Sequence, residues 1–363
     1  MTVYPASAAA STLDLPVIRH DVDAVLEEFL RHKVAAAADS FLPDEVPRAL
    51  EVFVFAGGKR LRPLLCVIGW HAVQDHGVTS AVVRAGAALE MFHAFALIHD
   101  DLMDRSDTRR GRPTVHRALA DRHRASRAPG DSDRVGASAA ILVGDLALAW
   151  SDELLHTAGL SPSQLAAVLP VVDMMRTEVM YGQYLDLVTT GRFTADVGAA
   201  LRVIRLKTAK YTCERPLHIG ALLGGGGPEV LAACTAFALP LGEAFQLRDD
   251  LLGAYGSVGT TGKSASDDFR DGKQTVLLAL ALQRADDSQQ RMLRKLIGNP
   301  DLDDDGAAGV REILTATGAR QEVERMIRAR FARALHALDE ASFTPSATAA
   351  LRRLAHTATE RTA

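Results

Sequence analysis

The stretch Ala96–His116, ALIHDDLMDRSDTRRGRPTVH, decides how the rest of this sequence of 363 residues is interpreted. Asp100, Asp101 and Asp104 end an apolar segment with helical periodicity. Asp100 and Asp104 stand at positions i and i+4, which share one helix face, so their carboxylates repel each other unless a cation lies between them. Oxygen ligands without cysteine suit a hard ion such as Mg²⁺. A solvated charge run that closes a helix is the alternative explanation of this stretch alone.

Arginine residues and a second acidic segment extend this pattern. Arg109 and Arg110 follow the first aspartates, and a metal beside guanidinium groups is a suitable receptor for a polyphosphate. FQLRDDLL at residues 245–252 again places an aspartate pair, Asp249 and Asp250, after an apolar helical run. The two acidic helix ends are therefore expected to face each other across a central cavity.

Other polar residues fit a diphosphate site. GGKRLRP at residues 57–63 combines flexible backbone with cations at a helix start, where amide donors and the helix dipole favour anions. Lys207 and Thr208 lie in a helical run among apolar residues, where an ordinary surface lysine is the alternative for Lys207. Gln183 and Asp186 interrupt another apolar run, which indicates a polar stripe that faces the cavity.

Composition favours a single all-α domain. Apolar residues make up 48% of the chain and aromatic residues only 5%, a balance that favours helix over strand. We expect a flexible N-terminal tail over residues 1–20 and one domain over residues 21–363, built as a bundle of roughly ten or more helices around a central cavity. Within it we expect a loop at 121–135, a kink at Pro216 and short helices after residue 268.

Charge, cysteine content and hydropathy indicate what the chain does not do. The net charge is −4 and basic residues are mixed with acids, so we expect no nucleic-acid partner. Three widely spaced cysteines in apolar surroundings indicate reduced, buried thiols. The first residues lack the pattern of a signal peptide, and no stretch of about 18 apolar residues is free of charge. We expect no transmembrane segment and a cytoplasmic location.

Seven ordered motifs carry a resemblance to a known family. In order they are GGKRLRP, EMFHAFALIHDDLMD, RRGRPTVH, GQYLDL, KTAKYTCERPLHIGALLGG, FQLRDDLLG, and TGK followed by DGKQT. From about residue 20 to about residue 300 the chain resembles the trans-type polyprenyl diphosphate synthases. The form of KTAKYTCERPLHIGA is most similar to actinobacterial geranylgeranyl diphosphate synthases.

The resemblance implies the helical fold of the isoprenoid synthases and a Mg²⁺-dependent prenyl transfer. Isopentenyl diphosphate is joined head to tail to an allylic diphosphate, whose ionisation three Mg²⁺ ions assist. This agrees with elementary chemistry, because heterolysis separates charge. Metal ions and lysine and arginine side chains stabilise the leaving diphosphate. An apolar pocket then protects the carbocation from water. The family is commonly dimeric, so a homodimer is expected.

The resemblance also assigns roles to individual residues. Direct metal ligation falls on Asp100, Asp104 and Asp249, with Asp101 and Asp250 as supporting carboxylates. The residues that match the isopentenyl diphosphate site are Lys59, Arg62, His93 and Arg110. The residues that match the allylic diphosphate site are Arg109, Lys207, Thr208, Gln246, Lys263 and Lys273.

Three positions depart from the family pattern. Gly253 stands where the second acidic motif often has a third carboxylate, so one metal is expected to be held more loosely, through water. Ser257 stands where an aspartate is common, and His116 where an aromatic residue is frequent. His99 is interpreted as an ordinary hydrogen-bonded helix histidine.

Three residues on the helix before the first acidic motif bear on product length. Family members with an aromatic residue five positions before the motif tend to give a twenty-carbon product, and Phe95 occupies that position beside the small Ala96. At about 1.5 Å per residue, Phe95 lies roughly 7 Å and Phe92 roughly 12 Å along the helix from Asp100. Helix periodicity places Phe92 and Ala96 nearer the Asp100 direction than Phe95, so either phenylalanine could be the floor. We predict geranylgeranyl diphosphate, with farnesyl diphosphate as the nearest alternative.

Two other classes of protein share part of this motif pattern. A class I terpene cyclase shares the first acidic motif but carries an Asn/Asp, Ser and Glu metal motif in its second half, which FQLRDDLLG is not. A non-catalytic partner subunit usually loses an acidic motif or the GGK cations, and both are present here.

Overall fold

The computed structural model describes residues 13–127, 129–256 and 266–359, and most of them are helical. This confirms the predicted all-α fold class. One short antiparallel pair, β1 (Thr108–Arg109) and β2 (Arg112–Pro113), forms the turn that follows the first acidic motif.

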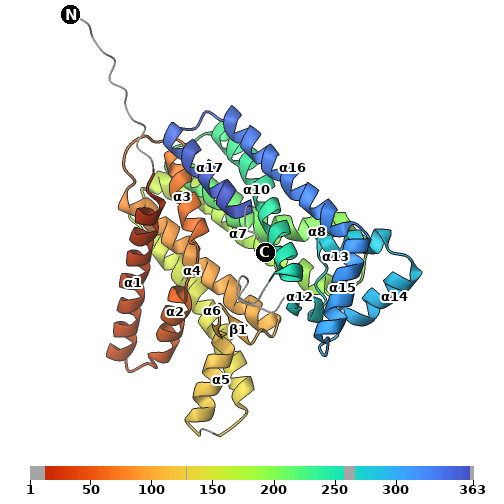
Figure 1. Ribbon diagram of the computed structural model, residues 1–363. Coiled ribbons are helices and arrows are strands. Elements are labelled where there is room, and N and C mark those ends of the chain that lie inside the picture. Colours follow the sequence, from red (N-terminus) through yellow and green to blue (C-terminus); the bar gives the residue numbers. More distant parts are fainter. Residues whose placement is uncertain (1–12, 128, 257–265, 360–363) are drawn as a thin grey trace, which may run out of the picture.

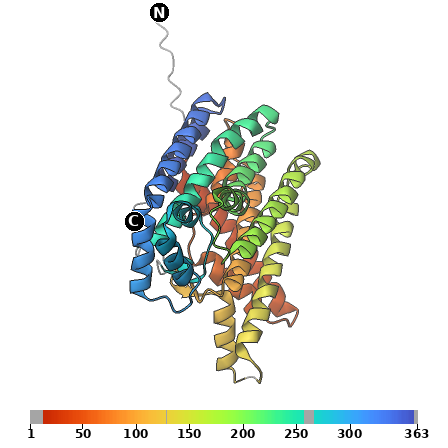
Figure 2. The same ribbon diagram turned by 90° about the vertical axis from the view of Figure 1, so that its right-hand side faces the viewer.

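The first half of the chain surrounds one buried helix, α4. Its elements are α1 (Leu15–Asp39), α2 (Glu45–Phe55), α3 (Leu61–His71), α4 (Ser80–Met103), α5 (Val115–Ala125), α6 (Ser132–His156) and α7 (Pro162–Thr189). Helix α4 packs mainly against α6, and most of its side chains are buried. Helix α5 and the adjoining end of α6 project from the bundle as a hairpin (Figures 1 and 2).

The second half is organised around α10. Its elements are α8 (Val197–Val203), the π-helix η1 (Ile204–Glu214), α9 (Arg215–Leu223), α10 (Pro228–Tyr255), α12 (Asp267–Arg270), α13 (Val276–Arg284), α14 (Asp287–Leu296), α15 (Asp304–Ala316), α16 (Ala319–Glu340) and α17 (Pro345–Thr359). Helix α10 packs against α16 and η1. The buried Glu243 of α10 joins these neighbours by accepting hydrogen bonds from Arg205 of η1 and, at 2.6 Å, from Arg330 of α16.

Two glycines allow α7 and α10 to approach η1 closely. A Cβ atom at Gly182 of α7 would lie 2.4 Å from the backbone nitrogen of Lys207, and one at Gly242 of α10 would lie 2.5 Å from Cα of Ala209. Both distances are far below ordinary contact, so these helices meet η1 backbone to backbone. The close approach fixes the position of Lys207 beside the ends of α4 and α7.

Three expectations about elements were wrong in detail. Helix α1 begins at Leu15, inside the expected tail, because Asp14 caps it by accepting from the backbone N–H of Val17. Helix α5 continues to Ala125 through the start of the expected loop. Pro216 lies in the first turn of α9, directly after η1, and the kink expected there stays a prediction. Helix α16 is long, with 22 residues.

Within the described residues, three helices are long and apolar enough to cross a membrane: α4, α6 and α10. The apolar windows of these helices are 72%, 33% and 50% buried inside the fold. The three cysteines, Cys66, Cys213 and Cys234, are free and buried, as expected.

Candidate active site

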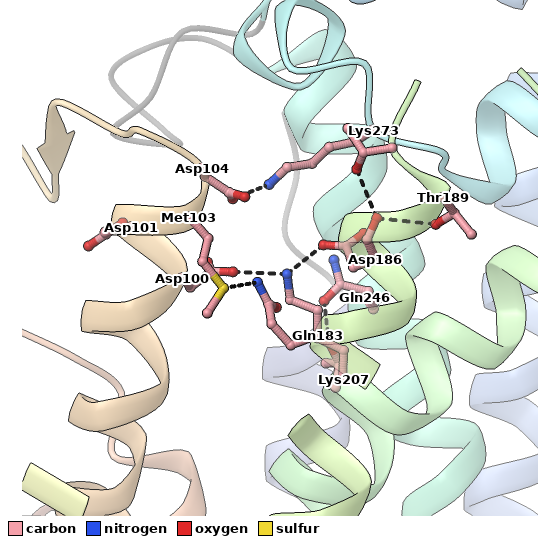
Figure 3. Close-up of polar contacts among 12 residues, drawn as sticks. Asp100, Asp101, Met103, Asp104, Gln183, Asp186, Thr189, Lys207, Gln246 and Lys273 are labelled. Carbon is pink, nitrogen blue, oxygen red and sulfur yellow. Dashed lines mark hydrogen bonds and ion pairs between the residues drawn. The ribbon is translucent and has the colours of Figure 1, made fainter. Parts of the chain in front are cut away.

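The first acidic motif meets two lysine side chains from other parts of the chain (Figure 3). Asp100 and Asp104 lie at the end of α4, and Lys207 projects from η1 towards them. The Lys207 ammonium donates to Oδ1 of Asp100 at 2.9 Å and to Oδ2 of Asp186 at 2.6 Å. Lys273 donates to Oδ2 of Asp104 at 2.8 Å. The cations that the i, i+4 aspartate pair requires are therefore supplied by the protein itself.

Electrostatics agree with this arrangement. Burial acts to raise the pKa of Asp100, but the Lys207 and Lys273 ammoniums outweigh it and hold that pKa at about 2. Burial likewise acts to lower the pKa of Lys273, yet Asp104, Asp268 and Asp100 raise it above its ordinary value. Asp100 and the two lysines, Lys207 and Lys273, are therefore charged at neutral pH.

Asp101 is held apart from its two neighbours in the motif. Arg109 donates to both of its oxygens, each at 2.7 Å, and the Asp101 side chain is only 1% exposed. Arg109 also lies 3.7 Å from Asp100. Asp101 therefore orients Arg109 beside the site, while Asp100 and Asp104 face the lysines.

The second acidic motif is joined to η1 by a chain of hydrogen bonds. Thr208 donates to Gln246 at 2.8 Å, and Gln246 donates to Oδ1 of Asp250 at 2.9 Å. Enclosure in the protein, with Asp268, Asp249 and Asp186 nearby, raises the pKa of Asp250 to about 7 although the Gln246 bond opposes the rise. Asp249 lies beside it, partly buried, at the same end of α10.

The Gly253 departure has a structural counterpart. A Cβ atom at Gly253 would lie 2.2 Å from Oδ2 of Asp268, so the Asp268 carboxylate occupies the space next to this glycine. Asp268 also lines one cavity with Asp250 and Lys273.

A second group of cations gathers around His93. His93 Nδ1 lies 2.8 Å from the Tyr211 hydroxyl, and the Arg62 guanidinium lies 4.1 Å from the centre of the Tyr211 ring while donating to Thr212 at 2.6 Å. Burial and the surrounding arginines, Arg62 first among them, hold the pKa of His93 well below its ordinary value. His93 is therefore neutral and can accept or donate a hydrogen bond.

The GGK turn joins this second group. Gly57 and Gly58 have φ values of 107° and 144°, which side-chain-bearing residues rarely adopt, and Arg110 donates to the Gly57 carbonyl. Lys59 is exposed beside them. Arg60 is instead buried and paired with Asp23 at 2.6 Å and Glu90 at 2.9 Å, so its role is in packing.

The two phenylalanines before the first motif contact each other, with 5.3 Å between ring centres, and differ in their other neighbours. Phe92 is 1% exposed, and the Tyr211 ring lies 5.8 Å from its ring. Phe95 instead packs against His99, at 4.8 Å between rings, and His99 contacts the backbone carbonyl of Ile141 on α6. Ala96 lies one turn from Phe92 on the same helix face.

Two of the residues singled out in the sequence, Ser257 and Lys263, lie outside the described residues. His116 is buried and within 3.2 Å of the Thr114 hydroxyl.

The donor chemistry of the site suits Mg²⁺. Among the described residues no three His, Cys, Asp or Glu side chains converge closely enough to enclose a metal ion, because Lys207 and Lys273 lie between the carboxylates. The donors at the ends of α4 and α10 are carboxylate oxygens, which fits an ion that takes its remaining ligands from water and phosphate.

Comparison with known proteins identifies the family. Residues 43–314 match the family model described as polyprenyl synthetase. This chain belongs to the polyprenyl synthetase family. It is a trans-prenyltransferase, as the sequence motifs predicted.

Individual relatives agree. A crystal structure of geranylgeranyl pyrophosphate synthase from Corynebacterium glutamicum, complexed with isoprenyl diphosphate and magnesium, is 42% identical with a TM-score of 0.93, and the match covers 96% of this chain and all of that one. Geranylfarnesyl diphosphate synthase of Aeropyrum pernix is 32% identical over 76% of this chain and 80% of its own length. Geranylgeranyl diphosphate synthase of Methanosarcina mazei is 32% identical over 65% and 67%.

Sequence reasoning gave no role to three residues that the structure places at the site. Asp186 was recognised only as part of a polar stripe, and it shares Lys207 with Asp100. Tyr211 follows Lys207 by four residues and could have been found from that spacing. Asp268 follows the undescribed segment, and no local pattern indicated its approach to Gly253.

Proposed function

We propose that this enzyme makes geranylgeranyl diphosphate, adding isopentenyl diphosphate to an allylic diphosphate that binds between the two acidic motifs. The observation that carries the proposal is the convergence of Lys207 and Lys273 on Asp100 and Asp104 at the centre of the bundle. An allylic diphosphate placed there meets ammonium groups on one side and metal-binding carboxylates on the other.

The metal set follows from the same placement. Asp100, Asp104 and Asp249 are proposed to hold Mg²⁺, three ions when substrate is bound, with Asp101 and Asp250 in support. When bound, Mg²⁺ neutralises the diphosphate and assists its departure.

The chain's own residues position the allylic substrate. The proposed diphosphate contacts are Arg109, Lys207, Thr208, Gln246, Lys263 and Lys273. The lysines and Arg109 stabilise negative charge as the carbon–oxygen bond breaks, and the Asp101–Arg109 pair keeps that guanidinium in place. Below them, Phe92 and its apolar neighbours exclude water from the carbocation.

Isopentenyl diphosphate is proposed to bind at the second group of cations, Lys59, Arg62, His93 and Arg110. These groups gather around the GGK turn and Tyr211, which supports the assignment. A neutral His93 adds a hydrogen-bond donor or acceptor without adding charge.

The proposed twenty-carbon length rests on Phe92, which lies on the same face of α4 as Ala96 and closes the apolar path. Farnesyl diphosphate is the nearest alternative.

We also propose a homodimer in the cytoplasm. Helices α6 and α7 expose large apolar side chains, including Leu142 at 62%, Tyr181 at 64% and Tyr184 at 61% exposure, which a second copy of the chain would cover. Light scattering on purified enzyme should give twice the chain mass, and Tyr181→Glu with Tyr184→Glu should give the monomer. Wild-type enzyme that stays monomeric at micromolar concentration would contradict the dimer.

The reaction is tested with radiolabelled isopentenyl diphosphate, farnesyl diphosphate and Mg²⁺. Label should appear in a twenty-carbon diphosphate when Mg²⁺ is available. No labelled product should form in reactions that contain EDTA. A cyclase would release diphosphate from the allylic substrate without consuming label, and a non-catalytic subunit would do neither.

A further inference from the structure

A cavity lies behind Phe92, on the side away from the acidic motif. Its lining combines Ala85, Ala88, Leu89 and Phe92 of α4 with Ser151 and Leu155 of α6, Val172, Met175 and Arg176 of α7, and Ile219 of α9. Ala88 precedes Asp100 by 12 positions on one helix, roughly 18 Å along the axis at 1.5 Å per residue. A product that grew past Phe92 would therefore enter this cavity.

Arg176 is the one charged side chain in this lining. Its guanidinium carbon lies 5.6 Å from the centre of the Phe92 ring, and its Nη2 donates to Asp152 and, at 3.3 Å, to Ser151. Its Nε is buried without a hydrogen-bond partner in the described structure. The Phe92 ring thus covers the inner face of a guanidinium whose outer end is held by α6.

A hydrocarbon tail that displaced Phe92 would remove the ring from Arg176 and put methylene groups against the buried Nε of a partly buried guanidinium. A cation gains from the face of an aromatic ring, whereas a saturated chain offers no such attraction and keeps water away. We propose that Arg176, held by Asp152, is a second stop for product length behind Phe92, acting through charge where Phe92 acts through bulk. The inference rests on the proposed function, because it requires the product tail to lie along α4.

The alternative is that Arg176 only ties α7 to α6. A matched control breaks another ion pair to α6: Lys33 of α1 donates to Glu153 at 2.6 Å and 2.5 Å, away from the cavity lining. Lys33→Met removes that ion pair without changing the product path. It should therefore leave product length unchanged both in the wild-type enzyme and in Phe92→Ala.

The experiment compares products of Phe92→Ala, Arg176→Met and the double variant by mass spectrometry. Phe92→Ala should lengthen the main product by one five-carbon unit and stop there, and the double variant should run on by at least one further unit. Arg176→Met alone should not lengthen it, since Phe92 still closes the path. Arg176→Lys with Phe92→Ala should keep the stop, because it keeps the charge.

The assay compares the proportions of products of different length. A variant that folds in lower yield therefore still shows whether Arg176 limits product length. A double variant that makes the same products as Phe92→Ala would overturn the charged stop while leaving the proposed function intact. Wild-type enzyme that forms no prenyl product would overturn both.

A separate observation concerns Gly253, where the second acidic motif lacks its third carboxylate. The Asp268 carboxylate lies 2.2 Å from the position that a Cβ of residue 253 would take, and it shares a cavity with Asp250 and Lys273. We infer that Asp268 supplies from α12 the carboxylate that α10 lacks, so that the metal-binding set is completed by a residue outside the motif. This inference also rests on the proposed function.

Moving the carboxylate from position 268 back to position 253 tests this inference. Binding of inorganic diphosphate in Mg²⁺ is measured by calorimetry, which requires no turnover. Asp268→Ala should weaken this binding by about tenfold or more, and the double variant Gly253→Asp with Asp268→Ala should recover most of the loss. Asp267→Ala is the control, because that neighbouring side chain accepts from Arg270 at 3.0 Å instead of approaching Gly253.

Two outcomes separate the hypotheses. Wild-type affinity in Asp268→Ala, alongside lost affinity in Asp249→Ala, would overturn the role of Asp268 alone. Wild-type affinity in Asp249→Ala would overturn the proposed metal site itself.

Discussion

Lys273 donates from its ammonium to Oδ2 of Asp104 at 2.8 Å, across 169 positions of sequence. Lys207 makes the equivalent contact with Asp100 at 2.9 Å. Each ammonium balances a carboxylate of the first acidic motif. The α4 carboxylates are therefore held close together on one helix face without mutual repulsion, and the cations that hold them are also those suited to bind a diphosphate.

Removing a carboxylate from either motif should abolish turnover. Asp100→Ala and Asp249→Ala are each expected to lower the rate by several orders of magnitude, because each removes a proposed ligand of the metal that stabilises the leaving group. Asp107→Ala is the control, since its side chain is 71% exposed and paired with Arg117. Turnover close to wild type in either variant, with an unchanged circular dichroism spectrum, would contradict the two-site metal assignment.

The two cation groups should affect different substrates. Lys59→Ala and Arg62→Ala are expected to raise the Michaelis constant for isopentenyl diphosphate, and Lys207→Ala that for the allylic substrate. Lys210→Ala is a matched control on the same π-helix, because Lys210 pairs with Glu178 instead of Asp100.

Lys207→Ala carries a second expected effect. Asp100 and Asp186 lose their shared partner, so the free energy of unfolding should fall by about 1–3 kcal/mol in the absence of ligand. Thermal unfolding measures this loss.

For the kinetic prediction, equal changes of both Michaelis constants in every variant would reject the division into two groups of cations.

The sequence predicted the fold class because it depends on strong local patterns. Helical periodicity and the acidic i, i+4 spacing are properties of single segments, and they placed Asp100 and Asp104 on one face. The contacts of Asp186 and Asp268 depend on how α7 and α12 pack, and no segment alone specifies that packing. The π-helix was missed for a related reason, since its geometry is set by the close approach of Gly182 and Gly242.

Phe92 should limit product length more than Phe95. Phe92→Ala opens the path towards the cavity on the α7 side, whereas Phe95 packs on His99 against α6. Phe92→Ala is therefore expected to shift the main product to a longer chain, and Phe95→Ala to shift it less. Mass spectrometry of the dephosphorylated products decides the order. A larger shift in Phe95→Ala would identify the other phenylalanine as the floor.

His93 predicts a pH dependence of stability. Its pKa in the folded protein is depressed, so below about pH 6.5 the unfolded chain binds a proton that the folded chain does not. The stability contributed by neutral His93 is present above that pH and is lost as the pH falls, by at most about 1.4 kcal/mol per pH unit. Denaturant unfolding at pH 7.5 and pH 5 should show a smaller loss in His93→Gln than in wild type. Equal losses would show that His93 takes up a proton in the folded enzyme.

The length of the wild-type product tests the central claim most directly. Enzyme, farnesyl diphosphate, isopentenyl diphosphate and Mg²⁺ are incubated, and the dephosphorylated products are identified by mass spectrometry. The site described here predicts a twenty-carbon alcohol as the main product, formed only when Mg²⁺ is present. Absence of product, or a main product of thirty or more carbons, would contradict the account.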